Sequence, residues 1–197
     1  MIVVKIGGSV AENAGNIIKA LFETSEKILI VPGGWIFADT VRKLNLDDDT
    51  AHWMAVMSMN LYGLYLSRFA ESIEPENFDF DFTGVKIILP YRLVRNFDEL
   101  PHSWDVTSDS IAIWIAEKVG AKKILKVTNV DGIIINGKLV REIEADRLHF
   151  QTCLDRYSPL LLKRFRRDMF ICNGLHVERI KNYITRGEAL GTTVVGR

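Results

Sequence analysis

Ile2-Val3-Val4-Lys5-Ile6-Gly7-Gly8-Ser9 is the stretch that decides the fold of this chain, because a short apolar strand runs directly into a pair of glycines. A second stretch repeats the pattern, with Ile28-Leu29-Ile30-Val31 running through Pro32 into Gly33-Gly34. Glycine lets the backbone approach a ligand that a Cβ atom would exclude, and a helix starting there adds the positive end of its dipole. Two such strand ends, one of them containing Lys5, predict a site for a dense anion such as a phosphoryl group in transfer.

Six short apolar runs alternate with six helical stretches along the rest of the chain. The runs are continuously apolar, which is typical of strands covered on both faces. This order predicts an α/β fold, a three-layer αβα sandwich around a largely parallel sheet, whose ligands bind at the carboxyl ends of strands. Strands are expected at 2–6, 28–31, 85–89, 123–127, 169–172 and 192–195, and helices at 11–24, 36–43, 49–72, 108–119, 154–166 and 177–185.

Two further segments have a predictable local structure. Asn136-Gly137 lies between two short apolar runs and is the preferred pair for a two-residue hairpin turn. The segment 74–83 contains Pro75 and three phenylalanines, and we expect a loop that carries buried aromatic rings.

The length and charge of the chain favour a single domain that binds small molecules. A chain of 197 residues, nearly half of them hydrophobic, can bury a sizeable core, and we expect one compact domain over 1–197 with two fused lobes that meet near Gly120. Its 25 acidic and 25 basic residues balance, so no net field favours nucleic acid or an anionic membrane. The basic cluster at 163–167 is local and is also consistent with a solvated helix face.

The two cysteines, Cys153 and Cys172, show no metal-ligand spacing. The chain starts with a strand rather than a signal peptide, and no apolar run approaches the roughly 20 residues of a membrane span. We therefore expect a cytoplasmic protein with reduced thiols and no metal site built from its own side chains.

Lys5 is the first candidate for chemistry, because a lysine in a buried strand is costly unless its ammonium group meets an anion. The alternative is that its side chain extends to solvent from the strand end. Neither a Walker P-loop nor a G-x-G-x-x-G fingerprint is present, so a standard mononucleotide or dinucleotide loop is excluded.

The segment His102-Ser103-Trp104-Asp105-Val106-Thr107-Ser108-Asp109 supplies a second set of candidates. Asp109 is predicted to hold lysine ammonium groups in place, as a phosphate site requires. Alternatively, Ser108 and Asp109 only stabilise the first turn of a helix. His102 and Asp105 are candidates for substrate contact, and His102 is also a candidate for a catalytic base.

A third set follows the strand at 123–127. Thr128-Asn129-Val130-Asp131-Gly132 is a polar strand end that can bind a nucleotide through Thr128 and exposed backbone, or can simply turn into the hairpin. The later junctions at Asn173-Gly174 and at 187–193 are interpreted as structural turns.

Taken in order, these junctions resemble the amino acid kinase family. The matching stretches span nearly the whole chain: Lys5 to Ser9, Val31 to Gly34, Ser108 to Ala112, Thr128 to Gly132, Asn173-Gly174 and Gly187 to Thr192. The resemblance implies an acceptor-binding lobe at 1–120 and a nucleotide-binding lobe at 121–197 that takes ATP. It also implies Mg²⁺ held mainly through the ATP phosphates, and phosphates bridged by Lys5.

One departure from the family pattern concerns the second cation. The Gly-Gly-Met-x-x-Lys segment that supplies an ATP-side lysine in many members is missing here. Lys163 is the substitute candidate and Lys126 is the other. The missing segment also permits a different class of function, a non-catalytic nucleotide or metabolite sensor on the same fold.

The segments 51–60 and 100–109 resemble a short archaeal and methylotroph branch of the family that acts in methanofuran biosynthesis. This resemblance implies phosphorylation of a small phosphate monoester to a diphosphate, with 5-(aminomethyl)-3-furanmethanol phosphate as a possible acceptor. The candidates for an apolar wall against a flat ring are then Trp53, Met54, Met57, Tyr62, Trp104 and the phenylalanines of the 74–83 loop, although such stripes are also typical of a core or a dimer interface.

Two alternatives stay open at this point. A carboxylate or a nucleoside monophosphate is an alternative acceptor, and a carboxylate would need a cation such as Arg42 or Arg68 near the second glycine pair. The helix at 49–72 is apolar on more than one face, so we expect it to be covered by the other lobe or by a second copy in a homo-oligomer.

The complete assignment has three parts. The catalytic candidates are Lys5, Asp109 and Lys163; the substrate-binding candidates are Gly7, Gly8, Gly33, Gly34, His102 and Asp105; the nucleotide-binding candidates are Ser9, Lys126, Thr128, Asn129, Asp131 and Gly132.

Overall fold

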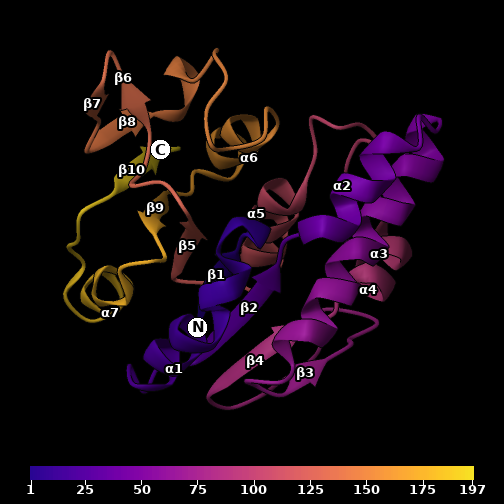
Figure 1. Ribbon diagram of the computed structural model, residues 1–197, viewed down its shortest axis with the longest axis horizontal. Coiled ribbons are helices and arrows are strands. Elements are labelled where there is room, and N and C mark those ends of the chain that lie inside the picture. The colour runs from indigo at the N-terminus through magenta and orange to yellow at the C-terminus, as the bar shows by residue number, and fades with distance from the viewer.

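A computed structural model describes residues 1–197, and one eight-stranded sheet runs through it (Figure 1). The strand order is β3-β4-β2-β1-β5-β9-β10-β8, and every neighbouring pair is parallel except β9 and β10. The strands are β1 (Ile2–Ile6), β2 (Ile28–Pro32), β3 (Ser72–Ile73), β4 (Val85–Ile88), β5 (Lys123–Thr128), β8 (Glu142–Glu144), β9 (Met169–Asn173) and β10 (Thr192–Val195). A separate hairpin joins β6 (Ile134–Ile135) to β7 (Lys138–Leu139).

Helices cover both faces of this sheet, which confirms the three-layer αβα sandwich. Successive residues of β1 enter two different apolar clusters: Val3 joins the cluster beneath α5 and α6, and Val4 joins the cluster beneath α1 and α7. The helices are α1 (Ala14–Phe22), α2 (Trp35–Lys43), α3 (Asp48–Leu66), α4 (Tyr91–Phe97), α5 (Ser108–Lys118), α6 (Ser158–Phe165) and α7 (Val177–Arg186), with 3₁₀ turns η1 (Gly8–Asn13) and η2 (Ala145–Arg147). The α3 helix supplies residues to both clusters, Val56 and Met59 to one and Tyr62 and Leu66 to the other.

The six predicted strands are all present, and the hairpin turns at Asn136-Gly137 as expected, with both residues at positive φ. The expected loop at 74–83 also buries its aromatic side chains, since Phe82 is in the core and Phe78 and Phe80 pack against it. The six strands could be predicted from local sequence, because a continuously apolar run is typical of a strand that is covered on both faces.

Three predicted helix boundaries are wrong. The helix expected at 49–72 ends at Leu66, because Ser72-Ile73 instead pairs with β4 as an edge strand. The helix expected at 154–166 begins only at Ser158, where Pro159 occupies the first turn. The helix expected at 11–24 begins as the 3₁₀ turn η1 and becomes regular only at Ala14, because Val10 has non-helical dihedral angles.

The short elements α4, β3 and β8 were not predicted, because two to seven residues carry too little periodicity to be recognised. Both cysteines are unpaired, and burial raises the pKa of the Cys172 thiol to about 12. None of the helices combines the length and the apolar character that crossing a membrane requires.

Candidate active site

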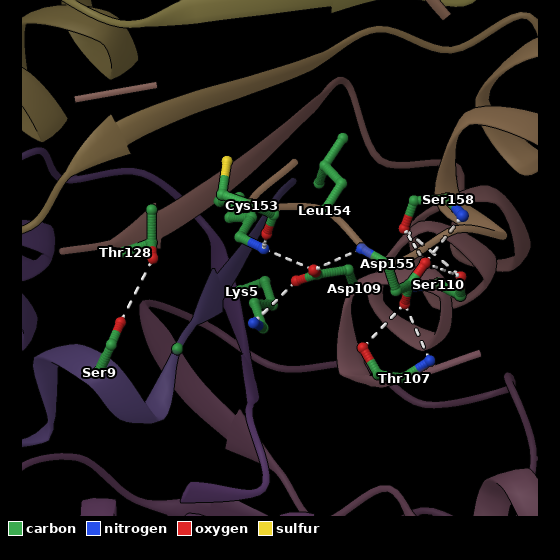
Figure 2. A network of polar contacts seen from close by, with 12 residues as sticks. Lys5, Ser9, Thr107, Asp109, Ser110, Thr128, Cys153, Leu154, Asp155 and Ser158 are labelled. Atoms are coloured by element: carbon green, nitrogen blue, oxygen red, sulfur yellow. Dashed lines mark hydrogen bonds and ion pairs between the residues drawn. The ribbon is translucent and has the colours of Figure 1, made fainter. Parts of the chain in front are cut away.

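The centre of the candidate site is a buried carboxylate between two lysines on adjacent strands. Lys5 of β1 and Lys126 of β5 are direct partners in the parallel register, so their side chains leave the same face of the sheet. Asp109, in the first turn of α5, meets both: Lys5 Nζ lies 2.7 Å from Oδ1, and Lys126 Nζ lies 2.5 Å from Oδ2. Figure 2 shows Lys5 and Asp109 directed toward each other. Asp109 was predicted to hold lysine ammonium groups in place, and in the structure it contacts two of them directly.

Two ammonium groups share the Asp109 carboxylate in this cluster, and the Asp155 carboxylate lies close enough to attract Lys5 as well. Burial raises the pKa of Asp109, but the charges of Lys126 and Lys5 outweigh it and hold that pKa well below its usual range. Burial lowers the pKa of Lys5, and the attraction of Asp109 opposes this effect only in part. An anion bound beside Lys5 would favour its charged form, as expected of a phosphate site.

Asp155 is a polar residue of the site that sequence reasoning missed. Its carboxylate accepts hydrogen bonds from the backbone N–H of Thr107 at 2.8 Å and of Ser110 at 3.0 Å, at the start of α5. It also accepts from the backbone N–H of Ser158 at 2.8 Å, at the start of α6 (Figure 2). Its own N–H points to Asp109 Oδ2 at 3.3 Å. The Asp155 side chain therefore satisfies the N-termini of two helices, and its residue borders the Asp109 carboxylate.

The two glycine pairs lie side by side at the carboxyl ends of β1 and β2. The Gly33 N–H donates to Ile6 O at 2.9 Å, and a Cβ atom at Gly33 would lie 3.2 Å from the Gly8 nitrogen. A Cβ atom at Gly8 would lie 2.4 Å from the Trp35 Cα atom, so only glycine fits there. The N–H groups of Gly8 and Gly34 donate to no acceptor within the protein. They are available to an anion, at the starts of η1 and α2.

A cleft of about 520 Å³ opens beside these glycines, and it is called the first cleft below. Its volume falls within the range of roughly 300–1,000 Å³ that is usual for small-ligand sites. Its lining is mainly apolar and aromatic, and its two charged side chains are Asp39 and Arg42. The residues that line it are Gly8, Ser9, Gly34, Trp35, Ile36, Ala38, Asp39, Arg42, His52, Ala55, Val56, Met59, Trp104, Val106, Thr107, Ser108 and Ile111.

A second cleft, of about 1020 Å³, lies on the other side of Trp104 and Thr107, which line both clefts. Asp109 lines the second cleft, together with Ala145, Asp146, residues 148–156 and, on α6, Pro159, Leu160 and Lys163. Of the buried cluster only Asp109 lines a cleft, the second, whereas Gly8 and Gly34 line the first.

Most of the predicted nucleotide-binding residues lie near the carboxyl end of β5 or just beyond it and line neither cleft, whereas Ser9, on η1, lines the first cleft. Ser9 and Thr128 lie in contact, with their hydroxyl oxygens 3.3 Å apart (Figure 2). Asp131 is engaged by the Asn173 amide at 3.0 Å and by Arg179 at 2.5 Å. Asn129 is exposed and Gly132 has a φ of +148°, which fits a turn toward the hairpin. Lys126 is buried against Asp109 and donates to the Cys153 carbonyl.

Two predicted substrate-binding residues lie away from the first cleft. The two ring nitrogens of His102 contact Asp49 and Asp98, each at 2.7 Å, and the ring stacks on His52 with centroids 4.1 Å apart. Burial lowers the pKa of His102, but these two carboxylates outweigh it and raise the pKa overall. His102 lines neither cleft, whereas His52 lines the first. Asp105 lines the second cleft, 4.0 Å from Arg156.

The neighbouring His52 is neutral at pH 7. Burial, together with repulsion from His102, lowers the pKa of His52 to about 4. Its Nε2 atom is buried and has no hydrogen-bond partner.

The apolar wall expected of the acceptor site is formed by other residues. Trp104 does line the first cleft, but the Met54 and Met57 side chains are exposed on α3, and Tyr62 is fully buried, with its hydroxyl donating to Gly7 O at 3.4 Å. Trp35 and Met59 complete the wall instead. The sequence signal that would have identified Trp35 is its position directly after the second glycine pair.

Among the candidate cations, Arg42 lines both clefts and lies 4.0 Å from the centre of the Trp104 ring. Arg68 stacks over Tyr65 and Phe69 instead. Lys163 lines the second cleft with its side chain 61% exposed, and pairs with Asp146 at 2.9 Å.

Comparison with known proteins gives the family. The family model described as "Amino acid kinase family" matches residues 82–150. The [5-(aminomethyl)furan-3-yl]methyl phosphate kinase of Methanocaldococcus jannaschii is 32% identical over an alignment that covers 100% of this chain and 98% of that protein. The chain belongs to the amino acid kinase family. It is therefore a kinase, which transfers a phosphoryl group from ATP.

Several solved structures share the fold of this chain. The UMP kinase of Bacillus anthracis has a TM-score of 0.76 at 16% identity, and the superposition covers 99% of this chain and 95% of that one. The uridylate kinase of Archaeoglobus fulgidus has a TM-score of 0.73 at 18% identity, with 98% of this chain and 99% of that chain covered. The aspartate kinase of Synechocystis also scores 0.73, at 14% identity, but only 40% of its longer chain is covered.

Proposed function

We propose that this kinase phosphorylates a small phosphate monoester to a diphosphate, with [5-(aminomethyl)furan-3-yl]methyl phosphate as the acceptor. The relative named for that activity spans the full chain. The observation that carries the proposal is the Lys5–Asp109–Lys126 cluster close to the glycine pairs: Asp109 lines the second cleft, and Gly8 and Gly34, whose N–H groups are free, line the first. Under this proposal the acceptor occupies the first cleft, which only residues of the 1–120 lobe line, and ATP occupies the second, which residues of both lobes line.

The reaction needs positioning and charge stabilisation more than proton transfer. An acceptor phosphate oxygen, already ionised, attacks the γ-phosphorus of ATP; the bond from that phosphorus to the β–γ bridging oxygen breaks, and ADP leaves with its electron pair. In this proposal the Lys5 ammonium group and the Gly8 N–H bind the transferred group, and the Gly34 N–H, at the start of α2, binds the acceptor phosphate. The N-termini of α5 and α6 are already satisfied by Asp155, whereas the Gly8 and Gly34 N–H groups, at the starts of η1 and α2, have no partner within the protein.

A magnesium ion in this proposal enters with the nucleotide. No group of three or more His, Cys, Asp or Glu side chains is arranged to hold a metal ion. Mg²⁺ commonly keeps several waters and binds through substrate phosphates. The site therefore fits a Mg²⁺ ion whose ligands come mostly from ATP and water.

We assign the second cation of the site to Lys126, in place of the ATP-side lysine that the missing family segment would supply. Lys126 is 3% exposed and shares Asp109 with Lys5, whereas Lys163 is largely exposed and paired with Asp146. A buried ammonium group loses little entropy on binding phosphate and acts in a low dielectric, so it stabilises charge more effectively than an exposed one.

This assignment predicts different outcomes for two matched substitutions. Lys126→Met should reduce turnover about tenfold to a hundredfold, the usual loss for one charge-assisted hydrogen bond. Lys163→Met should change turnover by less than about threefold, as expected for an exposed pair. Steady-state ADP release by both variants tests this; equal losses, or a larger loss for Lys163→Met, would transfer the role to Lys163.

The experiment that tests the function is an acceptor panel. The purified protein is incubated with ATP, Mg²⁺ and one acceptor at a time: the furan phosphate, a nucleoside monophosphate or a small carboxylate. ADP release is followed, and the masses of the products are measured by mass spectrometry. We expect a diphosphate from the furan phosphate at the highest kcat/KM. Turnover of a nucleoside monophosphate or a carboxylate instead would reassign the acceptor, and ATP binding without turnover of any acceptor would indicate a sensor.

We also propose that the protein is cytoplasmic and forms a homodimer through α3. Met54, Met57, Leu61 and Leu64 follow heptad spacing on one face of that helix, and their exposed fractions lie between 39% and 53%. A single apolar seam of this kind is self-complementary about a two-fold axis. A contiguous row of exposed apolar side chains usually marks a protein–protein interface.

The dimer proposal predicts that a charge in the seam produces monomers. Leu61→Glu should halve the mass that light scattering measures after gel filtration, because two buried carboxylates would face an apolar partner. Leu160→Glu is the matched control, since Leu160 is 61% exposed on α6, outside the seam. A wild-type protein that is monomeric at every concentration tested would refute the proposal.

A further inference from the structure

We propose that Asp39 binds the ammonium group of the acceptor and thereby selects amine-bearing phosphates over neutral ones. This inference rests on the proposed function, because it places the furan phosphate in the first cleft. It concerns a residue that neither the family motifs nor the sequence analysis singled out.

Asp39 supplies the only carboxylate in the first cleft. The remaining charged group of the lining is Arg42, whose guanidinium group lies over the Trp104 ring. His52 is neutral at pH 7, since burial lowers its pKa to about 4. Asp39 has no ion pair or hydrogen bond within the protein, so its charge is available to a ligand. An unpaired carboxylate in a phosphate-binding cleft would repel an acceptor that carried only negative charge.

The helix geometry places Asp39 at a suitable distance from the phosphate position. Trp35, Ala38, Asp39 and Arg42 all line the first cleft, and their spacing of three, one and three residues puts them on one face of α2. The acceptor phosphate lies at the N-terminal end of this helix, next to Gly34. At a rise of about 1.5 Å per residue, Asp39 is roughly 7 Å further along the axis.

That separation suits the proposed acceptor, whose ring carries a phosphomethyl arm and an aminomethyl arm. The phosphate takes the positive end of α2, and the ammonium group reaches the carboxylate more than one turn later. The ring between them lies against Trp35, Met59 and Trp104. A uracil ring has no cation at that position, so the same carboxylate disfavours a uridine acceptor.

A cycle of two proteins and two acceptors tests this inference. Wild-type protein and Asp39→Asn are each assayed with the aminomethyl furan phosphate and with the analogue that has a methyl group in place of the aminomethyl group. Asp39→Asn should lower kcat/KM for the amine about tenfold to a hundredfold, the range for a charge-assisted hydrogen bond, and should change that for the methyl analogue by less than about threefold. Calorimetry of acceptor binding without ATP should show the same selective loss.

Asp79→Asn is the control for a change of net charge, because Asp79 is exposed in the 74–83 loop, outside both clefts. The outcomes separate the two proposals. Equal losses for both acceptors, with the wild type active on both, would refute the role of Asp39 and leave the proposed function intact. A wild type that phosphorylates neither furan would refute the proposed function and this inference with it.

Discussion

Replacing Lys5 by alanine is expected to reduce turnover by about 10²–10³-fold while leaving the protein folded. The loss follows from removing a preorganised charge at the position of the transferred phosphoryl group. Stability should change little, because burial lowers the pKa of Lys5 in the native state and Asp109 keeps Lys126 as a partner. The measurement is steady-state ADP release beside thermal unfolding of the same preparations.

Lys86→Ala provides the matched control for Lys5. Lys86 also projects from a strand of the sheet and pairs with a carboxylate, Glu71, but it lies outside both clefts. This control should keep its turnover. A Lys5→Ala variant with wild-type turnover would end the assignment of Lys5 to the phosphate site.

Replacing Asp109 by asparagine is expected to damage both activity and stability. The substitution leaves two buried ammonium groups, those of Lys5 and Lys126, without an anion between them. Breaking a buried ion pair by removing one partner typically costs about 3–5 kcal/mol of unfolding free energy. Turnover should fall on the order of a hundredfold or more, because neither lysine is then held in place.

Denaturant unfolding and ADP release measured on the same protein check this result. High concentrations of ATP and Mg²⁺ should restore part of the lost stability, since bound phosphate replaces the missing negative charge. Asp81→Asn is the control, because Asp81 pairs with Lys27 at the surface with its side chain 88% exposed. An Asp109→Asn variant as stable and as active as the wild type would show that the carboxylate is not an organiser.

The sequence allowed prediction of those parts of the site that depend on local pattern. A strand that runs into two glycines is visible in a few consecutive residues, as is an acidic residue in the first turn of a helix. Gly7, Gly8, Gly33, Gly34 and Asp109 were therefore predicted from single segments, and the first four lie together as expected at adjacent strand ends.

The remaining parts depend on the register between distant segments. Lys126 meets Asp109 because β5 pairs with β1 so that Lys126 lies opposite Lys5, and no local pattern in 123–128 encodes that pairing. The contacts of Asp155 with two helix ends likewise exist only once α5 and α6 are packed. His102 shows the opposite case: its segment indicated a site, yet Asp49 and Asp98 hold its ring outside both clefts.

The carboxylate of Asp155 has a mechanical consequence for the second cleft. It accepts from the first turns of both α5 and α6, so these helices share one anchor at the cleft's wall. Moving α6 outward alone would break the hydrogen bonds that Asp155 accepts at the start of α5 as well. The backbone N–H groups of Thr107 and Ser110 would then lack a partner. The two helices are thus constrained to shift as one unit, and Asp109, carried on α5, would move with any opening of the cleft.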